Sequence, residues 1–160
     1  MIALRLVRLI EEHSDELADS IVRKFQSSPR TLDLSKVPAQ ELRLRTHDVL
    51  QHLSEWLLAK TESDIEELYR SVGERRASQG VALADMCWAF VLIKEELWSF
   101  LSRQGFLRGP LEIYGELELL RLLDQFFDHA IGYCAEGYQQ ALEARVGVTL
   151  VPEVRHGRPA

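Results

Sequence analysis

Histidine and cysteine are the residues of this chain best suited to metal binding or nucleophilic chemistry, and their spacing argues against both roles. His47 and His52 are five residues apart. On a helix this spacing separates their side chains by about 140 degrees, so they cannot share one ligand face. Cys87 and Cys134 are too distant in sequence for a CxxC motif, and neither has an adjacent Lys, Arg or His. We therefore expect no metal site and two buried structural thiols.

The carboxylates show no spacing typical of a general acid and base, and the chain has no glycine-rich phosphate loop. Acidic residues do concentrate on the last predicted helix, beside His129; they are Glu112, Glu116, Glu118, Asp124 and Asp128. A solvated face is the default interpretation, and a docking surface for a basic partner is the alternative. We predict that the protein is not an enzyme.

Composition sets the broad class of the protein. The chain has 160 residues, of which 46% are hydrophobic and 28% charged, as expected for one domain with an ordinary core. A net charge of -6 disfavours binding to nucleic acid or to anionic lipid.

The longest uninterrupted apolar stretch, Met86 to Ile93, is far shorter than the roughly 20 residues of a membrane span. Arg5 and Arg8 interrupt the apolar N-terminus, which predicts an amphipathic helix rather than an export signal. Cysteines within apolar segments favour a reducing cytoplasm.

Apolar residues recur at helical spacing along most of the chain, which predicts an all-α protein. The expected helices cover residues 1–28 (two short helices or one bent helix), 38–60, 63–80, 83–103 and 111–145. The segment from Ser27 to Val37 is the best candidate for an irregular loop. On the helix from Pro38 to Lys60, the pattern places Glu41, Arg43, Arg45 and Glu55 outward. We expect a single helical sensory or regulatory domain over 1–145 and a flexible C-terminal tail over 146–160.

Two helices stand out. The segment Met86 to Ile93 is apolar on nearly every side and is therefore expected at the buried centre of a bundle. A helix from Leu111 to Arg145 would measure roughly 50 Å, whereas a compact domain of this length is about 40 Å across. It must therefore bend, with Gly132 and Gly137 as the plausible points, or protrude. A protruding end would suit a second subunit, and the dimer-interface candidates are Phe126, Ile131, Tyr133 and Tyr138.

The junction before the central helix carries the best candidate regulatory residues. Gly73, Ala77 and Gly80 form a small-residue edge on the side of Tyr69, which allows a neighbouring helix to approach closely. Arg75 and Arg76 complement the helix dipole and could pair with acidic residues elsewhere. The functional alternative is an anion-binding or partner-binding site beside this junction. Its residues would be Tyr69, Gly73, Arg76, Gln79 and Gly80.

Aromatic residues offer a second candidate site. A helical core rich in large aromatic side chains can hold a ligand pocket between helices, although it is usually filled. The pocket candidates are Trp56, Trp88 and Phe90.

The segment Tyr69-x3-Gly73-x2-Arg76-Ala77-x-Gln79-Gly80-Val81-x-Leu83, with Phe90, Leu92, Ile93 and Trp98 downstream, resembles the signature of the RsbRD N-terminal domain family. The resemblance covers about residues 5 to 143. It implies a globin-like, haem-free sensory module that dimerises and has no catalysis of its own. Such modules commonly feed an output domain through the last helix. Since this chain ends soon after Arg145, the resemblance implies an output that belongs to another protein. The chain departs from the family at Ala82, where proline is frequent.

Two functions follow as expectations. The first is a noncatalytic, cytoplasmic sensory or regulatory domain of bacterial stress signalling, acting as a homodimer on a separate protein such as a kinase or a STAS-type regulator. The second is a globin-like protein that binds haem or a small apolar ligand, with His129 or His47 as the axial candidates for haem. No cofactor is expected under the first.

Overall fold

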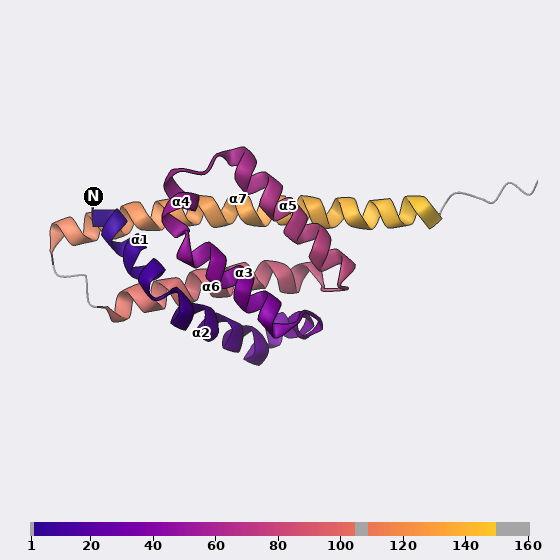
Figure 1. The fold of residues 1–160 in the computed structure, drawn as a ribbon, viewed down its shortest axis with the longest axis horizontal. Helices are drawn as coiled ribbons and strands as arrows, with labels where there is room; N and C mark the ends of the chain where they lie inside the picture. Colours follow the sequence, from indigo (N-terminus) through magenta and orange to yellow (C-terminus); the bar gives the residue numbers. More distant parts are fainter. Residues whose placement is uncertain (1, 105–108, 150–160) are drawn as a thin grey trace, which may run out of the picture.

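A computed structural model describes residues 2–104 and 109–149, and it consists of helices without a strand in these ranges (Figure 1). The all-α prediction is confirmed, while the globin-like arrangement stays a prediction. The elements are α1 (Ile2–Glu12), α2 (Ser14–Ser27), the 3-10 helix η1 (Pro29–Lys36), α3 (Ala39–Gln51), α4 (Leu53–Leu58), α5 (Glu62–Ser78), α6 (Leu83–Arg103) and α7 (Pro110–Thr149).

The first 28 residues form two helices that meet at His13, one of the two arrangements expected. The following segment differs from the prediction, because η1 replaces the irregular loop. Ser28 caps η1 by accepting a hydrogen bond from the amide of Arg30 at 3.2 Å, and Pro29 occupies the first helical position. The buried Thr31 hydroxyl donates to the carbonyl of Phe25 at 2.8 Å. These local bonds order a stretch whose composition resembles that of a loop.

The predicted helix from Pro38 to Lys60 is wrong as a single element, because it breaks at His52 into α3 and α4. The amide and the Nδ1 atom of His52 both lie within hydrogen-bond distance of the Asp48 carbonyl, at 3.3 and 3.0 Å. Two residues later, the amide of Ser54 donates to the carboxylate of Glu11 in α1 at 2.7 Å. A contact between distant segments therefore fixes the new helix start.

Helix α5 begins at Glu62, one residue before the expected range, which starts at Ser63. Thr61, rather than Ser63, is the N-cap, and it forms a capping box with Asp64. The helix ends as predicted, because Gly80 follows it with a φ of 74°, a backbone conformation that glycine adopts at little cost.

Helix α6 has the predicted bounds, but its apolar octet is not enclosed on all sides. Met86 and Phe90 are buried, whereas the other six residues of the octet are only partly buried. Leu83 and Trp98, at the two ends of the helix, are exposed. The expectation of complete burial was wrong, because no described helix covers one side of α6.

Helix α7 is a 40-residue rod that protrudes beyond the bundle at its C-terminal end (Figure 1). At 1.5 Å per residue it is about 60 Å long. It continues to Thr149, four residues past the boundary expected at Arg145, so the start of the predicted tail is helical; residues 150–160 lie outside the described ranges. No described helix combines the length and hydropathy that crossing a bilayer requires.

The most extensive contact between two helices joins α5 to α7. Gly73 and Gly137 make it possible. A Cβ atom at Gly73 would overlap with the carbonyl of Cys134, and one at Gly137 would overlap with the carbonyl of Arg70. The close approach predicted for Gly73 is thus present, and Gly137 serves packing rather than bending.

Candidate functional site

The predicted junction residues Arg76 and Gln79 meet at the carboxylate of Glu41, which comes from the first turn of α3. Arg76 Nη1 donates to Glu41 Oε1 at 3.1 Å and to Gln79 Oε1 at 2.7 Å, and Gln79 Nε2 donates to Glu41 Oε2 at 3.1 Å. Arg75 forms a bidentate pair with the same carboxylate. We call these four residues the Glu41 cluster. It joins the start of α3 to the end of α5.

Glu41 is mostly buried and strongly acidic in the folded protein. Its hydrogen bonds with Arg75 and Arg76 hold its pKa at about 2, against an ordinary value of 4.5 and despite the opposing effect of burial. Burial lowers the pKa of Arg76, and its bonds to Glu41 oppose that effect. The cluster is therefore an ion pair at neutral pH, with more positive than negative charge.

We expect Glu41→Gln to lower the free energy of unfolding by about 1–3 kcal/mol near neutral pH, because it leaves the buried guanidinium of Arg76 without its ionic partner. A carboxyl group with a depressed folded pKa stabilises above its unfolded value and loses this effect as pH falls through the folded one. The difference between wild type and variant should therefore shrink between about pH 4.5 and about pH 2. Urea denaturation across this range measures it. Glu74→Gln, at an exposed carboxylate of α5, should change stability little; an equal loss in both variants would contradict the role of Glu41.

Hydrogen bonds fix the junction beside this cluster. The amide of Ala82, at the start of α6, donates to the carboxylate of Asp33 in η1 at 2.9 Å. That bond caps α6 where the resembled family frequently has proline. Lys36 Nζ donates to the carbonyl of Gly80 at 2.9 Å, and the hydroxyl of Tyr138 donates to the carbonyl of Val81 at 2.7 Å. Helix α7 is thereby tied to the turn between α5 and α6.

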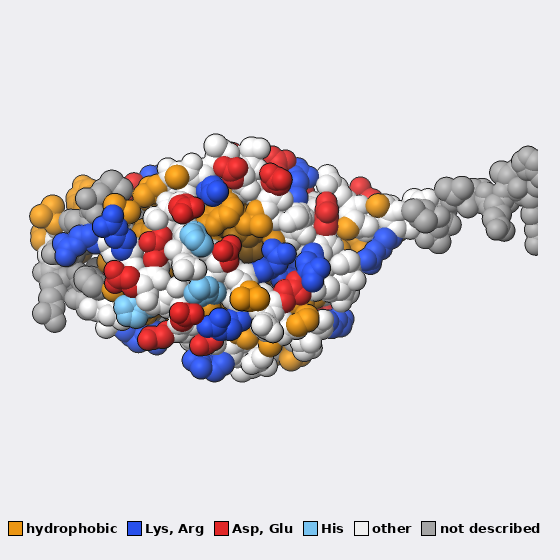
Figure 2. Space-filling model, in the orientation of Figure 1, with side chains coloured by type: hydrophobic (Ala, Val, Ile, Leu, Met, Phe, Trp, Pro, Cys, Tyr) orange, Lys and Arg blue, Asp and Glu red, His pale blue; other side chains and the backbone are white. Residues whose placement is uncertain are grey.

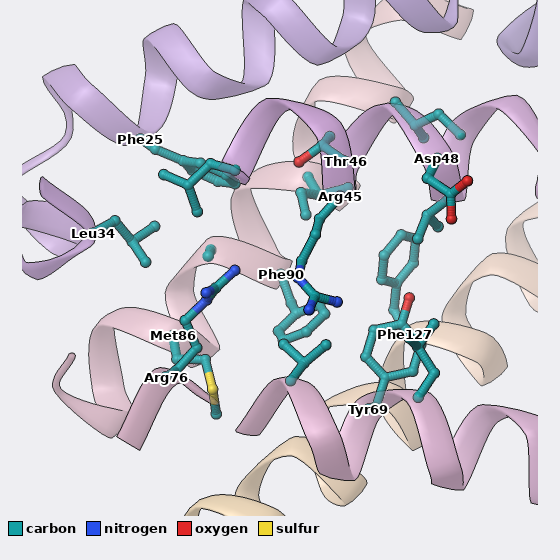
Figure 3. Close-up of a pocket in the computed structure, with 17 residues that line it drawn as sticks. Phe25, Leu34, Arg45, Thr46, Asp48, Tyr69, Arg76, Met86, Phe90 and Phe127 are labelled. Atoms are coloured by element: carbon teal, nitrogen blue, oxygen red, sulfur yellow. The ribbon is translucent and has the colours of Figure 1, made fainter. Parts of the chain in front are cut away.

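A cavity of about 120 Å³ lies next to the Glu41 cluster, between α3, α5 and α6. Figure 2 shows apolar atoms at the bottom of a hollow between α3 and α5, with charged side chains around its rim. Most of the lining is apolar, with Met86 and Phe90 from α6 and Phe127 from α7 (Figure 3). Its polar side chains are Arg45, Thr46, Asp48, Tyr69 and Arg76.

Only one of the three predicted pocket residues, Phe90, lines this cavity. Trp56 packs instead against the rings of Tyr69 and Phe126, with centroid separations of 6.3 and 6.0 Å. Trp88 lies under the guanidinium of Arg30, whose Cζ atom is 3.8 Å from the ring centroid. Both tryptophans are therefore packing residues in this structure.

The four dimer-interface candidates occupy different environments on α7. Phe126 is only 3% exposed, so it offers almost no area to a second subunit. Tyr138 contacts the α5–α6 turn, as described above. Ile131 and Tyr133 are half-buried, and the Tyr133 hydroxyl donates to the carboxylate of Glu62 at 2.6 Å. Dimerisation stays a prediction.

The residues around the cavity do not fit haem. No histidine of residues 2–104 or 109–149 lines it, and its volume is below the roughly 300 Å³ at which pockets for larger ligands begin. The two axial candidates lie elsewhere: His47 is 3.2 Å from the carboxylate of Asp15, and His129 contacts that of Glu62. Within the described ranges, no three residues of the His, Cys, Asp and Glu types gather as a metal site.

Sequence reasoning missed Glu41 and Arg45, which were expected to face outward. Glu41 instead contacts α5, and Arg45 lines the cavity. The one available signal was the presence of two adjacent arginines, Arg75 and Arg76, which need an acidic partner when one of them is buried.

The fold and the site define an all-helical domain with a small apolar cavity and a charged cluster at a helix junction. The chain matches the RsbT co-antagonist protein rsbRD N-terminal domain family over residues 15–149. It belongs to that family, as its signature at Tyr69 to Leu83 predicted. No curated protein and no solved structure matches it. The family is one of regulatory signalling domains.

Proposed function

We propose that this protein is a noncatalytic regulator of bacterial stress signalling that senses a ligand or partner at the α3–α5 face and acts on a separate protein, such as a kinase or a STAS-type regulator. Membership in the rsbRD N-terminal domain family carries this proposal. The arrangement of the helices supports it, because α7 contacts the junction beside the cavity and also extends outside the bundle. A change at the cavity would thus act on a helix that other molecules can reach. The proposed location is the cytoplasm.

The protruding end of α7 is the proposed output surface. Leu142 and Val146 are both exposed, and they lie four residues apart on one side of the helix. We expect Leu142→Glu with Val146→Glu to change stress-dependent expression of a transcriptional reporter in the native bacterium, with the fold retained by circular dichroism. Deletion of the gene sets the range of the assay. A reporter that responds identically in wild type, deletion and variant would overturn the proposed role.

The proposed regulator is a homodimer, with an interface on the uncovered face of α6 and the adjacent stripe of α7. Trp98 is 45% and Leu117 58% exposed, and large apolar side chains gathered on a surface often mark an interaction site. Ile113 lies about one turn before Leu117 on the same side of α7. Ile131 lies five turns after Ile113 and therefore points in the same direction from the helix axis. Hydrophobic side chains are also visible in Figure 2 at the end of the molecule where α7 begins.

We expect Leu117→Glu to convert the dimer to a monomer at micromolar concentration, because a charge would replace an apolar side chain at the centre of the interface. Sedimentation velocity measures the change. Leu44→Glu is the matched control, since Leu44 is equally exposed but lies on α3, and it should leave the dimer intact. A monomeric wild type, or a dimer that persists in Leu117→Glu, would rule out this interface.

The cavity favours one further function, the binding of a small apolar ligand, which is compatible with the regulatory role. Haem is not proposed as that ligand. An absorption spectrum of protein purified from haem-supplemented cells should lack a Soret band, and a stoichiometric band would contradict this expectation.

A further inference from the structure

The hydroxyl group of Tyr69 faces the cavity and makes no hydrogen bond within the part of the chain that the structure describes. The residue is only 4% exposed. It points into the cavity from α5 (Figure 3). A buried hydroxyl is normally hydrogen-bonded, because leaving it unpaired costs free energy. Since no fully buried side-chain oxygen or nitrogen of the described residues lacks a partner, the Tyr69 hydroxyl is accessible from the cavity, where water or a ligand can accept its hydrogen bond.

Arg45 supplies a positive charge to the same space. Its side chain extends from α3 towards the middle of the cavity (Figure 3). Its one ion pair within the described ranges is with Glu41, and the separation of 4.0 Å is too long for a hydrogen bond. Glu41 is already held by Arg75 and Arg76, at shorter range. Three guanidinium groups thus surround the carboxylate of Glu41, and that of Arg45 is the most distant and the most weakly attracted.

The nearby acidic residue does not cancel this charge. Asp48 also lines the cavity, but its side chain is mostly exposed and its Oδ1 atom lies 3.4 Å from His52 Nδ1. Burial raises the pKa of the Tyr69 hydroxyl above its ordinary value, so the group stays protonated and can donate a hydrogen bond. Thr46, a buried residue of the lining, adds a second hydroxyl without a hydrogen-bond partner among the described residues.

We propose that the cavity binds a small organic monocarboxylate, whose carboxylate meets the guanidinium of Arg45 and the hydroxyl of Tyr69 and whose apolar body lies against Met86, Phe90 and Phe127. A volume of about 120 Å³ is close to that of an apolar protein cavity of about 150 Å³ that accepts benzene. The body is therefore one ring or a chain of about four to six carbons. The inference names the ligand class of the sensory site proposed above and rests on that function.

Calorimetric titration of the whole protein with benzoate and hexanoate tests the proposal. Both should bind saturably in the millimolar range or tighter. They should bind at least about 10-fold tighter than benzyl alcohol and hexanol, because a hydrogen bond between ions is stronger than one to a neutral group, and than benzylamine, because its positive charge is repelled by Arg45. Carboxylates that do not bind, or that bind no better than the alcohols, would overturn the proposal. This comparison uses the wild-type protein alone, so it stands even if a variant fails to fold.

Variants locate the site. Arg45→Gln should weaken benzoate binding about 10-fold or more and leave benzyl alcohol unchanged, and Tyr69→Phe should weaken benzoate about 3- to 10-fold. Ala89→Leu, which fills the cavity, should weaken every probe. Arg43→Gln is the matched control, since Arg43 lies two residues away on α3 and pairs with Asp15 and Asp19. Equal losses in Arg43→Gln and Arg45→Gln would show a general effect of charge and overturn the assignment.

The stress reporter separates the two proposals. If the protein binds carboxylates but neither Arg45→Gln nor deletion of the gene changes the reporter, the proposed regulatory role is refuted and the proposed ligand class is retained. If the reporter response requires this protein but no carboxylate binds, the proposed ligand class is refuted and the proposed regulatory role is retained.

Discussion

Gly73→Ala is expected to lower the free energy of unfolding by about 3 kcal/mol, although alanine favours a helix over glycine by about 0.5–1 kcal/mol. The added Cβ atom would lie 2.8 Å from the carbonyl carbon of Cys134 and 2.9 Å from the amide nitrogen of Tyr138. These are backbone atoms of α7, which cannot turn away as a flexible side chain can. Helices α5 and α7 would have to separate along their whole contact. Urea denaturation followed by circular dichroism measures the loss.

Gly132→Ala is the matched control, because a Cβ at this helical glycine of α7 meets no atom within 4 Å. It should stabilise the protein by about 0.5–1 kcal/mol. Gly137→Ala should resemble Gly73→Ala, since its Cβ would lie 2.9 Å from the Cα atom of Arg70. The double variant Gly73→Ala with Gly137→Ala should lose less than the sum of the two, because one separation of the helices accommodates both methyl groups. Equal stability of Gly73→Ala and Gly132→Ala would refute the close crossing.

The second large effect is expected at Lys24, which neutralises a carboxylate inside the bundle. Glu96 of α6 is only 3% exposed, and Lys24 and Ser20 of α2 hold it at 2.6 and 2.9 Å. Burial alone would raise the pKa of Glu96, but these bonds outweigh it and lower the pKa. Lys24→Met leaves the buried carboxylate with Ser20 and with the more distant, exposed Arg103 at 3.4 Å, and we expect a loss of about 2–3 kcal/mol of stability at neutral pH.

The pH dependence of this loss has a definite sign. Without Lys24, the pKa of the Glu96 carboxyl in the folded protein should be higher. As pH falls this carboxyl becomes protonated, so the difference in stability between the variant and wild type should shrink. Chemical denaturation at several pH values measures it. Lys24→Met with Glu96→Leu should be close to wild type, since an apolar pair replaces both charges. Arg121→Met, which breaks an exposed pair with Glu118, should change stability by no more than about 0.5 kcal/mol. An equally small change in Lys24→Met would contradict the importance of the buried pair.

The sequence predicted the features that depend on a few neighbouring residues. Gly80 ends α5 because the chain needs a positive φ there, and Gly73 allows close packing because it lacks a Cβ atom. Features set by distant partners were missed. The break at His52 depends on the carboxylate of Glu11, and the direction of Glu41 depends on Arg75 and Arg76. Neither pairing leaves a trace in helical periodicity.

The candidate site shows the same division. Tyr69, Arg76 and Gln79 stood out because they share one helix and its end. The cavity did not, because its walls come from five helices and from η1. The apolar octet of α6 likewise indicated that the helix seeks apolar surroundings, but hydrophobicity does not reveal how many neighbours a helix has. Trp98 is exposed because no described segment reaches that side.

The length of α7 has a mechanical consequence. The helix crosses α5 near Cys134 and Gly137, and about twelve residues, or roughly 18 Å, extend from there to Thr149. If α7 tilted by about 10 degrees about this crossing, its C-terminal end would move by about 3 Å. Shifts of this size switch packed helical interfaces. At this crossing Gly73 and Gly137 place two backbones against each other, so the ion pair of Arg70 with Glu136 and the hydrogen bond from Tyr138 to Val81 would have to adjust to such a tilt.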